Sequence, residues 1–124
     1  MQRSFVLWIV VAFLTLGLAP VFALNFPSGG QGPWGIAITQ NQQNLIVANV
    51  SSNEVAFIDM TSGAVLAEVA SGQGPKNLTL SGDGATCYVV NSQSNDVSIL
   101  DVTNKQVTGH IAIEGSPQNL QITP

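Results

Sequence analysis

Charge of either sign is scarce in this chain. Only 8% of its 124 residues are charged, with three Lys and Arg residues against seven Asp and Glu residues. Binding to nucleic acid or to anionic lipid depends on clustered Lys and Arg that neutralise phosphates. The composition therefore argues against nucleic acid as a partner and against docking on an anionic membrane surface.

Cysteine and histidine are nearly absent as well. Cys87 is the only cysteine, so no disulfide can form within the chain, and His110 is the only histidine. A zinc site needs three or four His, Cys or carboxylate ligands, and an attached haem c needs Cys-x-x-Cys-His, which does not occur here. We therefore predict no metal and no cofactor, and we interpret Cys87 as a small apolar residue of a strand.

A long hydrophobic run occurs once, at the amino terminus. Arg3 precedes the apolar stretch Phe5–Ala19, and Val21-Phe22-Ala23 follows it with the pattern of a signal-peptidase site. We predict a secretory signal over residues 1–23, which would place the protein in the periplasm, at the cell surface or outside the cell. The alternative is an uncleaved anchor extending to Leu24, which would be the chain's only contact with the membrane.

What the chain does have is an internal repeat. The stretch LIVANVSSNEVAFID (Leu45–Asp59) returns 42 residues later as CYVVNSQSNDVSILD (Cys87–Asp101). Residues 32–73 and 74–115 are identical at 11 of 42 positions, and a period of about 40 residues is typical of repeat architectures. The predicted organisation is a signal peptide over 1–23, a lead-in strand or loop over 24–31, repeats over 32–73 and 74–115, and the start of a third repeat over 116–124.

Each repeat divides into four short apolar segments separated by turn residues. In the second repeat the segments are Asn77–Ser81, Cys87–Asn91, Val97–Asp101 and Val107–Ile113. Short segments rich in Val, Ile and Leu, bounded by Gly, Asn, Asp and Ser, predict antiparallel strands. CYVV and VSIL are apolar on both faces, as expected for a sheet that is covered on both sides. We therefore predict an all-β fold built of four-stranded β-propeller blades, in an incomplete propeller.

Two stretches of the second repeat, LTLSGDG (Leu78–Gly84) and YVVNSQSNDVSILD (Tyr88–Asp101), closely resemble the unit of the YVTN-type β-propeller family. The first repeat departs from that unit, because TQNQQN replaces the Ser-x-Asp-Gly turn. The resemblance implies a propeller in an exported or surface-layer protein, near the quinoprotein dehydrogenase and haem d1 nitrite reductase propellers, and it implies little about activity.

The number of repeats leads to a further expectation. The residues after the predicted signal hold about 2.4 repeats, whereas propellers have 4–8 blades. We expect that the propeller is completed either by further blades in a longer gene or by several copies of this chain.

Three motifs suggest chemistry and are interpreted as structural. Gly30–Gly35 has the pattern G-x-G-x-x-G, but a strand rather than a helix is expected after it, so a dinucleotide site is not predicted. His110 is expected on the solvent side of an outer strand, at the position that Glu68 holds in the first repeat. Asp59 and Asp101 are interpreted as turn caps, because calcium needs six to eight oxygens and each loop offers one Asp. No catalytic residue is predicted.

Trp34 is the one candidate for contact with a ligand. It stands where the second repeat has Lys76, at the entry to the predicted inner strand, and there it could stack on a sugar or a quinone. The alternative, more usual for Trp, is that it caps the apolar interior.

The leading functional hypothesis is an exported, non-catalytic module for binding or scaffolding in the cell envelope. Its partners would be a protein or glycan ligand and either further copies of the chain or further blades. The second hypothesis is the N-terminal part of a periplasmic propeller oxidoreductase, of the quinoprotein or haem d1 type, whose cofactor groups lie in other blades.

Overall fold

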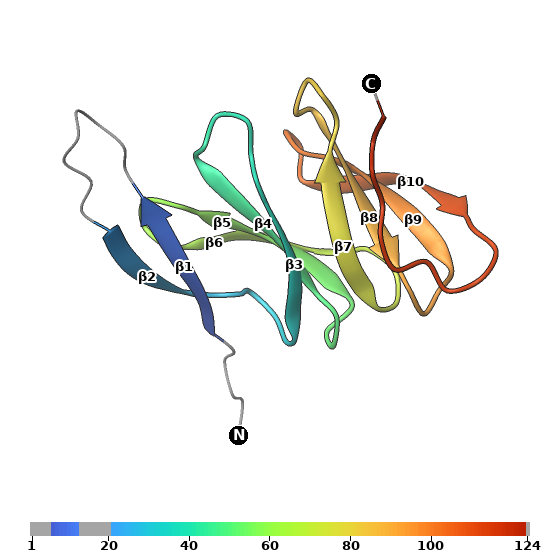
Figure 1. The fold of residues 1–124 in the computed structure, drawn as a ribbon, viewed down its shortest axis with the longest axis horizontal. Helices are drawn as coiled ribbons and strands as arrows, with labels where there is room; N and C mark the ends of the chain where they lie inside the picture. The colour runs from blue at the N-terminus through green and yellow to red at the C-terminus, as the bar shows by residue number, and fades with distance from the viewer. Residues whose placement is uncertain (1–5, 13–20, 124) are drawn as a thin grey trace.

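Antiparallel sheets make up the regular structure of the computed structural model, which describes residues 6–12 and 21–123, with side chains described for residues 28–123. A hairpin of β1 (Val6–Ala12) and β2 (Val21–Pro27) precedes two four-stranded sheets (Figure 1). The first sheet is formed by β3 (Pro33–Ile38), β4 (Asn44–Asn49), β5 (Glu54–Asp59) and β6 (Val65–Ala70) in sequence order. The second is formed by β7 (Pro75–Leu80), β8 (Thr86–Asn91), β9 (Asp96–Asp101) and β10 (Gln106–Ala112), also in sequence order.

The two sheets correspond to the two sequence repeats. The first three strands of the two sheets start 42 residues apart, as β3 and β7 do at Pro33 and Pro75, and the fourth strands, β6 and β10, start 41 residues apart. All four segments predicted in the second repeat are strands, with ends that differ by at most two residues from the prediction. The all-β class and the four-stranded antiparallel blade are confirmed. No described residue belongs to a helix with the length and hydropathy of a membrane span.

Asparagine makes the turn between the second and third strand of each sheet. Asn53 and Asn95 have φ values of 59° and 55°, a left-handed conformation that Asn tolerates better than most residues. Asn53 has a second role, because its Oδ1 accepts a hydrogen bond of 2.9 Å from the backbone N–H of Gly74 in the linker between the sheets. The turn of one sheet thus fixes the start of the next.

The two sheets pack face to face through a single apolar cluster. The face that the second sheet turns toward the first, here called its leading face, is formed by Leu78, Leu80, Cys87, Val89 and Leu100. The opposing face of the first sheet, here called its trailing face, is formed by Ile46, Ala48, Val55 and Phe57. Phe57 is the largest fully buried side chain of this interface. Each strand therefore contributes alternate residues to two different packing surfaces, which explains why its sequence does not alternate between apolar and polar residues.

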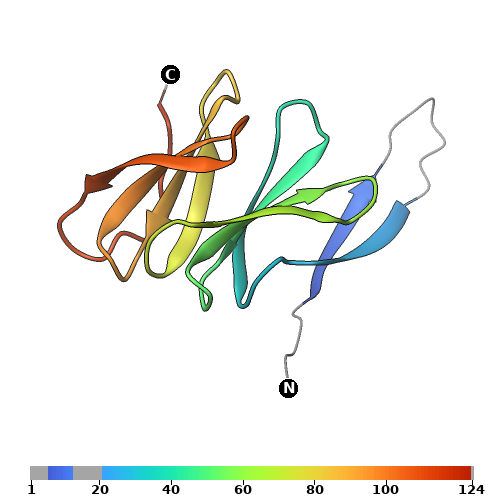
Figure 2. The ribbon, with the colours of Figure 1, turned by 180° about the vertical axis from the view of Figure 1, so that it is seen from behind.

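The first sheet has a leading face of its own, on the side away from the second sheet. Cross-strand partners in register share a face, which places Ile36, Ile38, Leu45, Val47 and Ile58 together there. Leu45, Val47 and Ile58 are fully buried, whereas Ile36 and Ile38 are about half exposed. The β1–β2 hairpin stands beside the first sheet on this side (Figures 1 and 2). Cleavage after Ala23, which stays a prediction, would cut within β2.

Beyond β10 the chain turns back and runs beside β7 (Figure 1). Residues 116–123 form no strand, but their side chains contact β7 in the spacing of the repeat. Lys76 Nζ donates to Gln118 Oε1 at 2.8 Å, and the amide of Asn77 pairs with that of Asn119. Both pairs join residues 42 apart, so this segment occupies the position of the next inner strand.

Candidate functional site

The only histidine lies in a polar network on the second sheet. His110, on β10, stands directly opposite Ser98 on β9, with Asp96 two residues earlier on β9. His110 Nδ1 is 3.0 Å from Asp96 Oδ2 and 3.3 Å from Ser98 Oγ. The side chain of His110 is about half exposed, as expected from the sequence, whereas Ser98 is fully buried.

This Ser-His-Asp arrangement does not have the geometry of a nucleophilic triad. In such a triad the carboxylate and the serine bind opposite nitrogens of the imidazole. Here both approach Nδ1, and the hydroxyl of Ser98 already donates to the carbonyl oxygen of Ser71 at 2.9 Å. The proton on Nδ1 can then be donated to Asp96, which orients the ring and leaves Ser98 without a base. The arrangement ties β9, β10 and the linker together.

Asn91 is the centre of this network. Its Nδ2 donates to Asp96 Oδ1 at 3.0 Å and to Ser98 Oγ at 2.8 Å, and its Oδ1 accepts from Ser71 Oγ at 3.2 Å. Ser94 Oγ also donates to Asp96 Oδ1, at 2.7 Å. Every polar atom of the buried Asn91 side chain is therefore partnered, as expected for a polar group without access to water.

The first sheet lacks this network, although it has the same asparagine. Glu54, Ala56 and Glu68 stand in the places of Asp96, Ser98 and His110, so two carboxylates replace a carboxylate and an imidazole. Asn49 Nδ2 donates to the carbonyl oxygen of Ser28 at 3.0 Å, and its buried Oδ1 has no hydrogen-bond partner among the residues that the structure describes. The first sheet thus forms the same strands without the polar network.

Trp34 lies on the surface, which corrects the expectation that it caps the interior. Its side chain is 70% exposed, and Trp34 lies where the pairing of β3 with β4 shifts register, between Pro33 and Gly35. The ammonium of Lys76, the equivalent residue of the next repeat, lies 5.6 Å from the centre of the indole ring, a cation–π distance. Trp34, Lys76 and Gln118 therefore form a row of equivalent positions along the inner strands.

The G-x-G-x-x-G motif packs against the turn between β4 and β5. The carbonyl oxygens of Gln31 and Gly32 accept backbone hydrogen bonds from the turn between β4 and β5, at 3.1 and 2.8 Å. A Cβ atom on Gly30 would collide with side chains of that region, and β3 rather than a helix follows the motif. The structural interpretation of this motif agrees with the fold.

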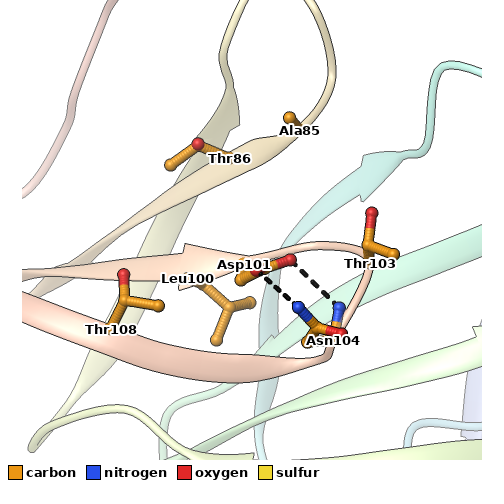
Figure 3. A pocket seen from close by; sticks show the side chains of 7 residues that line it. All are labelled: Ala85, Thr86, Leu100, Asp101, Thr103, Asn104 and Thr108. Atoms are coloured by element: carbon orange, nitrogen blue, oxygen red, sulfur yellow. Dashed lines mark hydrogen bonds between the residues drawn. The ribbon is translucent and has the colours of Figure 1, made fainter.

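Both aspartates that resemble calcium ligands cap turns. Asp59 Oδ1 accepts from the backbone N–H groups of Thr61 and Ser62 at 2.8 and 2.9 Å. Asp101 accepts from Asn104 twice, from its backbone N–H at 3.0 Å and from its side-chain amide at 2.9 Å (Figure 3). Hydrogen bonds to the ionised form lower the pKa of both carboxyl groups, mainly through the backbone of Ser62 for Asp59 and of Asn104 for Asp101. Within the described residues no group of three or more His, Cys, Asp or Glu side chains could hold a metal ion.

The cysteine of the second sheet is not placed for chemistry. Cys87 is fully buried on the leading face, and burial raises the pKa of its thiol to about 12. Reactive cysteines have a lowered pKa and access to solvent, so Cys87 fills space as a small apolar residue.

A polar cleft separates the loops at one end of the two sheets. The β3–β4 turn, the β7–β8 turn and the β9–β10 turn line it, with Gln40, Asn41, Asp83, Thr103 and Lys105 among the lining residues. Gln40 Nε2 crosses it to donate to the carbonyl oxygen of Gly82 at 3.3 Å. The cleft is open, and none of its lining residues pairs a nucleophile with a base.

The sequence did not predict the Asp96–Ser98–His110 network. A signal was present, because Asp96 and Ser98 alternate onto one face and the short β9–β10 turn brings β10 alongside. However, the pairing shifts by one residue between Val107 and Gly109. That bulge decides which β9 residue faces His110, and the residue pattern does not predict the bulge.

Comparison with known proteins supports the fold. No family model matches the chain, and no curated protein sequence is similar to it. Hydrazine synthase from Kuenenia stuttgartiensis matches 70% of this chain and 25% of its own, with 32% identity and a TM-score of 0.67. A functionally unknown protein from Desulfotomaculum acetoxidans matches 81% of this chain and 35% of its own, with 21% identity and a TM-score of 0.64. A candidate 6-phosphogluconolactonase from Bacteroides uniformis matches 85% of this chain and 36% of its own, with 14% identity and a TM-score of 0.64.

These neighbours are propeller proteins, so the two sheets are blades of a partial β-propeller. The chain spans between about a quarter and about a third of the length of each of them. Two of the matches are below 25% identity and bear on the fold alone.

Proposed function

We propose that this chain is an exported, non-catalytic β-propeller module of the YVTN type, which binds or scaffolds other components of the cell envelope. The observation that carries the proposal is the internal use of His110. The single histidine binds Asp96 and Ser98 through the same nitrogen, and that geometry stabilises a sheet rather than activating a nucleophile. The other ionisable candidates, Asp59, Asp101 and Cys87, cap turns or fill the core.

The assignment to the YVTN type is supported by the placement of the residues that resemble that family. YVVN lies in β8, and NDVSILD runs from the turn at Asn95 through β9. SGDG forms the β7–β8 turn, in which Gly84 has a φ value of 72° and Asp83 Oδ1 accepts from the hydroxyl of Ser81 at 2.6 Å. Each part of the motif thus has a structural role in the blade.

Trp34 is the proposed ligand contact of this module. An exposed indole beside an ammonium group presents both an aromatic face and a cation, and a glycan or an acidic protein segment could bind to that pair. Trp34 is the only tryptophan after residue 23. If cleavage occurs as predicted, the fluorescence of the mature protein therefore reports on this position alone.

The experiment tests export, cleavage and catalytic activity on the protein expressed from its gene. The chain is expressed with its own leader in a bacterial host, the exported fraction is purified, and its N-terminus is sequenced. We expect a start at Leu24 and no turnover of ester, phosphate or lactone substrates, with no haem or quinone absorbance. A chain that retains Met1 in the membrane would refute the predicted cleavage, and turnover that disappears in His110→Ala would refute the non-catalytic role.

The second candidate function is a portion of a propeller oxidoreductase. The observation in its favour is the likeness to hydrazine synthase, which is 32% identical over 70% of this chain. Gene sequence beyond residue 124 separates the two candidates. Further blades that contain histidine ligands or a Cys-x-x-Cys-His motif would favour the oxidoreductase.

A further inference from the structure

The interface between the two sheets is a template for a second interface of the same kind. The leading face of the second sheet packs on the trailing face of the first. The repeat places the same class of residue, 42 positions earlier, on the leading face of the first sheet. There Ile36, Ile38, Leu45, Val47 and Ile58 correspond to Leu78, Leu80, Cys87, Val89 and Leu100.

The second sheet also carries a complementary trailing face. Tyr88, Val90, Val97 and Ile99 on that face correspond to Ile46, Ala48, Val55 and Phe57 of the first sheet. Ile111 on β10 corresponds to Val69, which packs against the inter-sheet cluster, and Ile111 is 47% exposed. One molecule therefore has a leading face and a trailing face of the kind that already pack on each other between its two sheets.

We propose that copies of the exported chain associate head to tail, with the leading face of the first sheet of one copy docked on the trailing face of the second sheet of the next. The inference rests on the proposed export, because removal of residues 1–23 takes away β1 and part of β2, the hairpin that stands beside the leading face of the first sheet (Figure 2). Ile36 and Ile38 of this face are already about half exposed with the hairpin in place.

The occupant is a second copy rather than an unrelated partner because both faces are apolar and correspond to the two faces that already pack on each other. The inter-sheet interface shows that apolar residues at these positions of the repeat pack together. A heterologous interface of this kind closes into a ring when its rotation is a fraction of a full turn. The 4–8 blades of known propellers correspond to rings of two to four copies with two blades each, and we expect three or four.

Residues 116–123 compete with the incoming copy. They lie where the inner strand of the next blade would lie, and side-chain bonds from Lys76 and Asn77 hold them there. Docking of β3 from the next copy would displace this segment, which pairs with no strand in the described structure.

The experiment uses two variants that each disable one face. Ile38→Asp places a charge on the leading face of the first sheet, and Ile111→Asp places one on the trailing face of the second. Both side chains are about half exposed, so neither change buries a full charge in the single copy. Leu66→Asp is the matched control, because Leu66 is 46% exposed and lies at the register shift between β5 and β6. Its counterpart Thr108 stays exposed although the leading face of the second sheet is covered.

Light scattering on a size-exclusion column gives the mass of the exported protein. We expect three or four chains for the unmodified protein and for Leu66→Asp, and one chain for Ile38→Asp and for Ile111→Asp alone. An equimolar mixture of the two single-face variants should give a complex of two chains, since each supplies the face that the other has lost. The mixture also shows that both variants are folded.

Three outcomes would overturn the inference. A monodisperse single chain for the unmodified protein would show that the faces remain covered or need no cover. Single-face variants that fail to combine would show that the association is not head to tail. Equal association of all variants, the control included, would show non-specific aggregation. Each outcome leaves the export and activity tests of the proposed function standing, so failure of one proposal is distinguishable from failure of the other.

Discussion

The two buried asparagines provide a quantitative test of how the polar network contributes to stability. Asn49 and Asn91 are fully buried at equivalent positions of the two sheets. Asn91 makes three side-chain hydrogen bonds, whereas Asn49 makes one within the described residues and has an unpartnered Oδ1. Replacement by Ala removes the same atoms at both sites, so the cavity contribution to the loss largely cancels.

The difference is therefore set by two hydrogen bonds and by the unpartnered Oδ1, because Asn49→Ala also relieves the cost of burying that atom. At about 1 kcal/mol of net stabilisation for each bond, Asn91→Ala should lower the free energy of unfolding by at least about 2 kcal/mol more than Asn49→Ala does. For a domain of this size that corresponds to a difference on the order of 10 °C in Tm. Urea unfolding followed by circular dichroism, at one protein concentration and with equal m-values, measures it. Equal losses for the two variants would show that the network adds nothing beyond packing.

Three other changes have expected outcomes. Cys87, with a pKa of about 12, should resist a thiol-reactive reagent at pH 8 until the protein unfolds, and rapid labelling of the native protein would contradict its burial. The pKa of Asp101 is lowered in the folded protein, so the ionised carboxylate contributes stability above the unfolded pKa, and this stability is lost as the pH falls through the folded pKa. The Tm of Asp101→Asn should therefore fall less between pH 6 and pH 3 than the Tm of the unmodified protein. Parallel curves of Tm against pH would refute this. Glu68→His places an imidazole near Glu54, as His110 lies near Asp96. The substitution should raise Tm by a few degrees at pH 5.5 and not at pH 8, because an exposed ion pair contributes up to about 1 kcal/mol. A gain in Tm that does not depend on pH would exclude the ion pair as its cause.

The fold was predictable because its signals are local and occur twice. Val47 and Val89, or Asn53 and Asn95, are the same residue 42 positions apart, and each position needs that residue for a reason visible in one strand or one turn. Asn53 and Asn95 take a left-handed backbone conformation, and apolar residues on both faces of the middle strands indicate that the sheet is covered on both sides. Each copy of the blade needs the same residue types at these positions, so the pattern occurs in both repeats.

The exposure of Trp34 was not predictable from the type of residue. Tryptophan is usually well buried, which favoured the apolar interior over an exposed ligand contact. Trp34 lies at the register shift between Pro33 and Gly35, and the ammonium of Lys76 lies 5.6 Å from the centre of its ring. The facing of His110 does depend on a shift of this kind, between Val107 and Gly109. The single extra residue in β10 places Ser98 opposite His110.

The comparison of the two sheets also shows how a loss of activity in the His110→Ala variant should be interpreted. The first sheet has glutamate in place of His110 and alanine in place of Ser98, and it still forms four strands with a fully buried core. A blade of this chain therefore does not need the network in order to fold. Because His110→Ala should leave the second sheet assembled, any activity that disappeared in that variant could be attributed to the imidazole itself rather than to a collapsed blade. The non-catalytic role proposed for this chain is thus open to direct refutation by one substitution.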